Sequence, residues 1–118
     1  MGATDGSVLV QSADGARALV VGAVPDTDAV LRTTAGAAVT SVDAVVVDRD
    51  NSAVATTLHE LRVALRVRWV LGPPGLELAG VQAVPPGKVR VGGLELTLGG
   101  DPPRWHAAGP DGDVGPAR

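Results

Sequence analysis

One stretch in the middle of the chain restricts the possible folds more than any other. Residues 44–47 read Ala-Val-Val-Val, with Asp43 before them and Asp48 after them. A β-branched run without polar alternation is typical of a strand that is buried on both faces. Such strands occur where helices or a second sheet cover both sides, so we expect a layered α/β fold with this strand at its centre.

The clearest helix follows this strand. Val54, Leu58, Leu61 and Leu65 fall at positions i, i+4, i+7 and i+11 and form a single apolar stripe. Ser52 is the predicted N-cap. A second apolar stretch over 67–71 comes next, and a strand–helix–strand order implies that at least part of the sheet is parallel.

Turn residues divide the rest of the chain into short elements. The runs 7–11 and 17–21 flank an Asp-Gly turn and predict a β-hairpin. A short helix over 28–34 is expected after them, capped by Asp26 or Thr27. Pro and Gly clusters then separate three expected short antiparallel strands, 81–84, 88–91 and 94–98. The predicted fold class is α/β: a mixed sheet with two helices and a C-terminal β-meander.

Composition changes sharply near the C-terminal end. Nine of the twenty residues over 99–118 are Gly or Pro. We therefore expect one domain over 1–98 and a disordered tail over 99–118. Trp105 lies in that tail, where it is either idle or an anchor for a partner. Trp69 shares a strand face with Val67 and Leu71 and is expected in the core.

Charge and cysteine content exclude several kinds of site. The chain of 118 residues has no Cys, a formal net charge of −3 and 2% aromatic residues. Disulfides and thiolate metal sites are thereby excluded, and the charge has the wrong sign for bulk attraction to nucleic acid or anionic membranes. The longest apolar stretch, 18–24, is too short to span a bilayer. We expect no cofactor, no membrane contact and no nucleic-acid partner for this segment.

Chemistry is most plausible in the loop between the central strand and the main helix, because α/β proteins place ligands at such strand ends. Asp48 and Asp50 stand there. The sequence Val-Asp-Arg-Asp-Asn-Ser resembles the first motif of haloacid-dehalogenase-type phosphotransferases. That resemblance implies Asp48 as nucleophile and Asp50 as general acid/base, with Mg²⁺. The alternative is that both residues serve the turn and the helix cap.

A second resemblance covers residues 5–98. The segments 5–10, 17–26 and 42–47 resemble the metallo-β-lactamase superfamily, and more narrowly the hydrolase-like C-terminal domain of ComEC-type competence DNA-uptake proteins. The resemblance implies half of a layered αββα fold. It places the family's metal motif on four positions of the loop and the following helix: Asp48, Asp50, Ser52 and Ala53.

These positions no longer carry the family's ligands, since alanine has no donor atom and both leading histidines are replaced. The resemblance therefore implies a degenerate, truncated and non-catalytic relative, with a structural or interaction role in which DNA uptake is one setting. We expect a protein partner or a homodimer through an uncovered sheet face or edge. The chain would be cytoplasmic if it stands alone, and membrane-associated if it is the tail of a larger competence protein.

One basic cluster and two histidines complete the candidates. Arg62 and Arg66 are four residues apart, and Arg68 follows. They could contact a phosphate backbone, which is the basis for a third alternative, a DNA-contacting accessory domain; the other interpretation is a solvated face. His59 and His106 are expected at the surface and not as metal ligands.

Overall fold

The computed structural model describes residues 8–21, 26–36, 38–78, 80–99, 104–109 and 112–114. Two helices and nine strands form within these ranges. The helices are α1 (Thr27–Gly36) and α2 (Ser52–Ala64). The strands are β1 (Val8–Gln11), β2 (Arg17–Val20), β3 (Ser41–Val46), β4 (Arg66–Gly72), β5 (Gln82–Ala83), β6 (Gly87–Val91), β7 (Leu94–Gly99), β8 (Arg104–Gly109) and β9 (Gly112–Val114).

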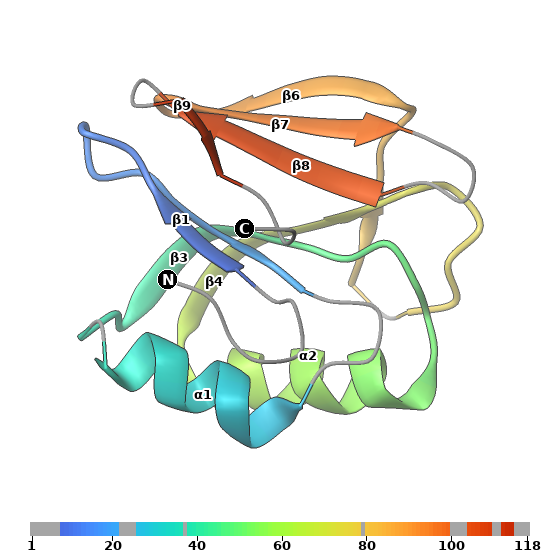
Figure 1. The fold of residues 1–118 in the computed structure, drawn as a ribbon. Helices are drawn as coiled ribbons and strands as arrows, with labels where there is room; N and C mark the ends of the chain where they lie inside the picture. Colours follow the sequence, from blue (N-terminus) through green and yellow to red (C-terminus); the bar gives the residue numbers. More distant parts are fainter. Residues whose placement is uncertain are drawn as a thin grey trace.

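The elements stack in three layers (Figure 1). The middle layer is a mixed sheet of order β1-β2-β3-β4-β5, with β1 antiparallel to β2 and the other neighbours parallel. Both helices lie on one face of this sheet, and an antiparallel meander sheet of order β6-β7-β8-β9 lies on the other. The predicted α/β class, with a mixed sheet, two helices and a C-terminal meander, is confirmed.

The central strand is buried as its sequence predicts. Ala44, Val45 and Val46 on β3, and Val47 just after it, are 0% exposed. Helices on one side and a second sheet on the other exclude water from both faces, which is why the run shows no polar alternation.

Both helices start at side-chain caps. Asp26 accepts a hydrogen bond from the backbone N–H of Ala29 at 3.2 Å, so the expected cap of α1 is confirmed. The cap of α2 is Asn51, whose Oδ1 accepts from Val54 N at 2.9 Å. The prediction of Ser52 was wrong by one residue, because the longer Asn side chain, one position earlier, reaches the third N–H of the helix.

The two faces of the mixed sheet carry separate apolar cores. The predicted stripe of α2 packs into the helix-side core together with valines and leucines of β1 to β4 and α1. The meander-side core joins small residues of the mixed sheet, such as Ala18 and Ala44, to Leu94, Leu96 and Leu98 of β7. The predicted alternation of β7 is therefore confirmed, with its leucines inward.

Two expectations about the C-terminal half are wrong. The segment 81–84 contributes β5, which pairs in parallel with β4 at Leu71 and Gly72 instead of joining the meander. The disorder expected over 99–118 does not hold for 104–109 and 112–114, which extend the meander as β8 and β9. Interstrand pairing to β7, together with burial of Trp105, overrides the Gly and Pro content.

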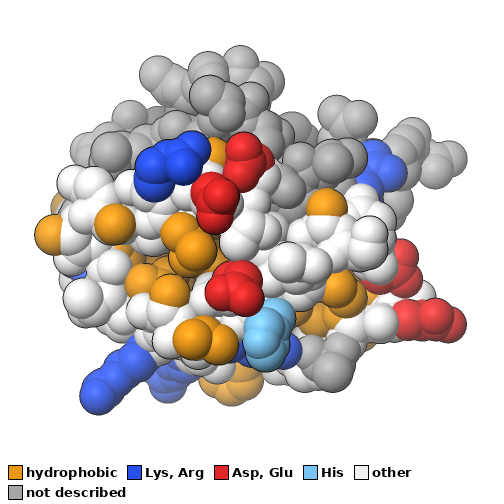
Figure 2. Space-filling view, turned by 90° about the horizontal axis from the view of Figure 1, so that it is seen from below, with side chains coloured by type: hydrophobic (Ala, Val, Ile, Leu, Met, Phe, Trp, Pro, Cys, Tyr) orange, Lys and Arg blue, Asp and Glu red, His pale blue; other side chains and the backbone are white. Residues whose placement is uncertain are grey.

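Within the described part of the chain, a core covers each face of the mixed sheet, so the wholly uncovered face that the truncated fold would allow is not found there. On the helix side of the molecule, apolar side chains lie in several small groups with charged side chains among them (Figure 2). No helix in the described ranges is long and apolar enough to cross a membrane.

Candidate functional site

The polar residues of the loop after β3 make contacts with neighbouring segments of the fold. Asp50 Oδ2 accepts a hydrogen bond from the backbone N–H of Glu77 at 3.1 Å, which ties the segment after β4 to the start of α2. Asp48 is mostly buried, with 13% of its side chain exposed, and its Oδ1 lies 3.9 Å from Arg49 Nε. Ser52 and Ala53 form the first positions of α2.

Within the described ranges, no group of three or more His, Asp or Glu side chains could hold a metal ion. The two aspartates of the phosphotransferase-like motif thus have local structural partners: Asp50 holds a neighbouring loop, and Asp48 lies beside Arg49. Neither aspartate caps α2, because that role belongs to Asn51.

The structure separates the three candidate arginines. Helix α2 ends at Ala64, so Arg66 belongs to β4 and does not lie one helical turn from Arg62. A Cβ added at Gly80 would lie 2.5 Å from an Arg62 guanidinium nitrogen, which places that side chain against the loop before β5. Arg66 and Arg68 stay together on β4, and both are exposed. His59 is exposed on α2 as expected, and the side chain of His106 lies outside the described residues.

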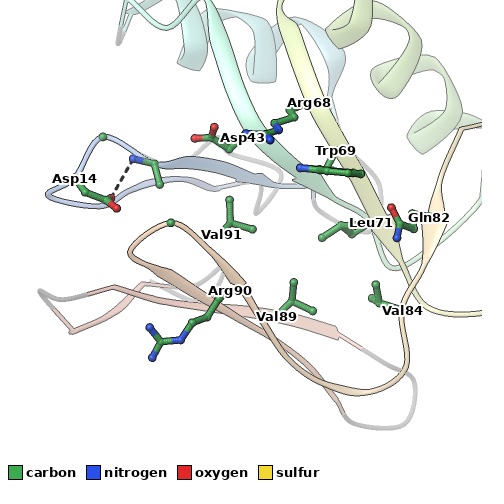
Figure 3. Close-up of a pocket in the computed structure, with 13 residues that line it drawn as sticks. Asp14, Asp43, Arg68, Trp69, Leu71, Gln82, Val84, Val89, Arg90 and Val91 are labelled. Carbon is green, nitrogen blue, oxygen red and sulfur yellow. Dashed lines mark hydrogen bonds between the residues drawn. The ribbon is translucent and has the colours of Figure 1, made fainter.

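A groove of about 640 Å³ lies between the two sheets, beside β4. One wall is the mixed sheet, with Trp69 and Leu71 from β4 and Gln82 from β5. The opposite wall is Val84 with Val89 and Val91 of β6, whose side chains point toward β4 (Figure 3). Its volume lies in the range of small-molecule and peptide sites, and its walls are mainly apolar.

Trp69 is the largest apolar group on this surface. Its side chain is 46% exposed, so the expectation that it belongs to the core is wrong. The extent of the meander explains the difference. The meander covers Leu71 on the same strand, but it does not extend over Trp69. The Arg68 guanidinium carbon lies 5.9 Å from the centre of the Trp69 ring, within the range of a cation–π contact.

The alternation of side chains between the two sheet faces is interrupted at one position in each of β3 and β4. Val42 and Val45 both pack in the helix-side core, although regular alternation would place residues three apart on opposite faces. Val67 and Val70 repeat this spacing on β4. The matching interruptions fall at residues 43 and 68, between the register pairs Val42–Val67 and Ala44–Trp69.

This interruption places polar side chains at the groove. Asp43 and Arg68 both line it, and Asp43 Oδ2 accepts a hydrogen bond from Arg17 N on β2 at 2.9 Å. The Asp43 carboxylate thereby replaces the backbone carbonyl of β3 that would otherwise accept this hydrogen bond from β2. Irregular strand positions of this kind are frequent next to binding sites, where they redirect side chains.

The far end of the groove is formed by the β1–β2 turn. Asp14 Oδ1 accepts hydrogen bonds from Ser12 Oγ and from Ala16 N, the latter at 3.3 Å. These bonds, that from Ser12 first, hold the pKa of the Asp14 carboxyl below its usual range. A Cβ at Gly92 would come within 2.6 Å of Ala16 Cβ, so the β6–β7 turn closes this end against the hairpin.

The groove is also bordered by an open strand edge. β4 pairs with β3 at residues 66, 67 and 69–71, but with β5 only at Leu71 and Gly72. Over 66–69, the described residues provide no second neighbour for β4. One sequence signal could have located this edge: Arg66 and Arg68 alternate with Val67 and Trp69, and exposed basic residues on a strand are typical of sheet edges.

A scan against protein-family models finds no match for the chain, and a search of curated proteins finds no similar sequence.

Proposed function

We propose that this chain is a non-catalytic interaction domain that binds a partner protein in the groove beside β4. The observation that carries the proposal is the exposed Trp69 at an apolar groove between two otherwise well-packed sheets. Partly exposed tryptophans with neighbouring arginines are the residues most enriched among strong contributors to protein binding.

The loop after β3 supports the non-catalytic part of the proposal. Asp50 and Asn51 are engaged in holding a loop and capping a helix. Asp50 thereby has a structural contact of its own, which supports a role for this loop in holding the fold.

Descent from a metallo-β-lactamase-like domain is part of the same proposal. Helices, a mixed sheet and a second sheet in that order are compatible with part of a layered αββα fold. A role beside the DNA-uptake machinery would follow from that descent. The neighbouring coding sequence tests it, since a preceding multi-span membrane region is the expected finding and its absence would remove the support.

The interaction role is tested by photo-cross-linking. A benzoylphenylalanine residue replaces Trp69 in one variant and Val63, which is 73% exposed on α2, in the control. In the native host, the variant at position 69 should give one discrete protein adduct that the control does not give. Equal labelling from both positions, or none from position 69, would refute the proposed binding surface.

The absence of catalysis is tested separately with an aryl phosphate and an aryl phosphodiester in the presence of Mg²⁺, Mn²⁺ or Zn²⁺. We expect no turnover that depends on Asp48. Hydrolysis that disappears in Asp48→Asn would instead establish the phosphotransferase-like alternative.

A further inference from the structure

The open edge of β4 indicates how a partner is held, an inference that rests on the proposed function. Among the residues that the structure describes, 66–69 have a neighbouring strand, β3, on one side, and β5 occupies the other side just beyond them, at Leu71 and Gly72. An extended segment placed beside residues 66–69 would therefore lie in line with β5, on the same side of β4, and would add a strand to the mixed sheet. Addition of a strand to an exposed edge is a common mode of peptide recognition.

The charges at this edge specify the chemistry of the segment. Arg66 and Arg68 are exposed, and neither forms an ion pair with any residue in the described part of the chain. The two acidic side chains that line the groove already accept backbone hydrogen bonds, Asp14 from Ala16 N and Asp43 from Arg17 N. Both carboxylates keep their negative charge, so the positive charge that lacks an ion-pair partner among the described residues is that of the strand edge itself, on Arg66 and Arg68.

A second copy of the chain fits this edge poorly. Antiparallel pairing of two β4 edges would bring two arginines from each copy together, and like charges on paired strands are destabilising. Basic residues on edge strands protect against this kind of self-association. The same residues favour an acidic strand, because carboxylates pair well with guanidinium groups.

We propose that the groove binds an extended segment of a partner protein that contains both acidic and apolar residues. Its backbone pairs with residues 66–69 of β4, its carboxylates lie against Arg66 and Arg68, and one apolar side chain lies on Trp69 between the two sheets. The backbone contacts supply the alignment, and the arginines and the groove select the side chains.

The test uses a fluorescein-labelled hexapeptide of valine and glutamate residues, with binding followed by fluorescence anisotropy. Saturable binding is expected, weakened about tenfold by Arg66→Glu and by Arg68→Glu, as for loss of a charge-assisted contact. Arg32→Glu is the matched control, because it makes the same charge change on the exposed surface of α1. It should leave the affinity unchanged.

Changes to the peptide keep the test independent of protein folding. Methylation of alternate peptide nitrogens should abolish binding, since it removes strand donors, and a valine–lysine peptide should not bind. Binding that tolerates methylation, equal binding of the lysine peptide, or no saturable binding up to millimolar concentration would each overturn the proposal. So would a dimer, measured by light scattering, that Arg68→Glu alters.

The two proposals fail in different ways. A position-69 adduct without binding of the acidic peptide overturns only the acidic-strand inference. Absence of the adduct overturns the proposed function itself.

Discussion

The two faces of the mixed sheet differ in how completely they are covered, and the difference locates the binding groove. The helix face is closed by valines and leucines from α1, α2 and four strands, and the central members of this core are fully buried. The meander face is closed only in part. There the sheet presents alanines, a Trp from β8 fills the space above them, and coverage stops short of Trp69.

This difference shows that a sheet face covered by helices adjacent in sequence is buried more completely than one covered by a distant part of the chain. Two amphipathic helices cover one face, because each follows a strand directly in the sequence and packs its apolar stripe against the sheet. The meander approaches from the C-terminal part of the chain and is held by contacts such as Trp105 Nε1 donating to Val47 O at 2.8 Å. Where those contacts end, an apolar groove remains.

The largest effect is expected from ending the chain after Gly99. This removes β8, β9 and Trp105, and loss of a buried Trp alone costs about 3–5 kcal/mol, against a total stability of about 5–15 kcal/mol for a domain. Thermal unfolding followed by circular dichroism should lose its cooperative transition. A chain ending after Val114 is the control and should unfold like the full chain. Unchanged unfolding of the shorter chain would restore the expected 1–98 domain.

The two tryptophans should differ strongly under the same substitution. Trp105 is 2% exposed and hydrogen-bonded, so Trp105→Ala should lower the free energy of unfolding by about 3–5 kcal/mol. Trp69→Ala, at a surface position, should lower it by less than about 1 kcal/mol. Urea denaturation measures both. Similar losses for the two variants would mean that Trp69 is part of the core after all.

A smaller effect is expected at the start of α2. Asn51→Ala should cost about 1 kcal/mol, because Val54 N loses its acceptor, whereas Asn51→Asp should retain most of the stability. Ser52→Ala is the matched control and should change the free energy of unfolding by less than about 0.5 kcal/mol. A larger loss at position 52 than at 51 would return the cap to Ser52.

The smallest effect is expected at the closed end of the groove. The pKa of Asp14 is lowered in the folded chain, so its ionised form stabilises the fold above the unfolded pKa, and this contribution is lost as the pH falls through the folded pKa. The stability difference between the native chain and Asp14→Asn should therefore be constant above about pH 4 and shrink below it. Urea denaturation between pH 2 and 7 would detect it, and a difference that grows on acidification would contradict the assigned hydrogen bonds.

The sequence predicts those parts of the molecule that depend on local patterns. The central strand, the stripe of α2, the first hairpin and the inward leucines of β7 all follow from periodicity or turn chemistry. The position of β5 and the order of the segment around Trp105 do not, because both depend on pairing with strands far away in the chain.

The sequence directs attention to the loop after β3, whereas the groove is formed by residues that lie far apart in the chain. Asp48 and Asp50 attract attention by type and position, yet Asp50 serves a loop contact. The groove needs residues from β4, β5, β6 and the β1–β2 turn, which only the tertiary fold brings together. The alternating arginines of β4 were the one local sign of its edge.

The indole N–H signals of the two tryptophans give the most direct test of the groove as a binding surface, since Trp69 lines it and Trp105 is buried in the core. In a two-dimensional ¹H–¹⁵N titration with the valine–glutamate peptide, the Trp69 indole signal should shift and saturate while the Trp105 signal stays in place. If the Trp69 signal stays in place while peptide binds, or if both signals move together, the binding surface does not lie beside β4.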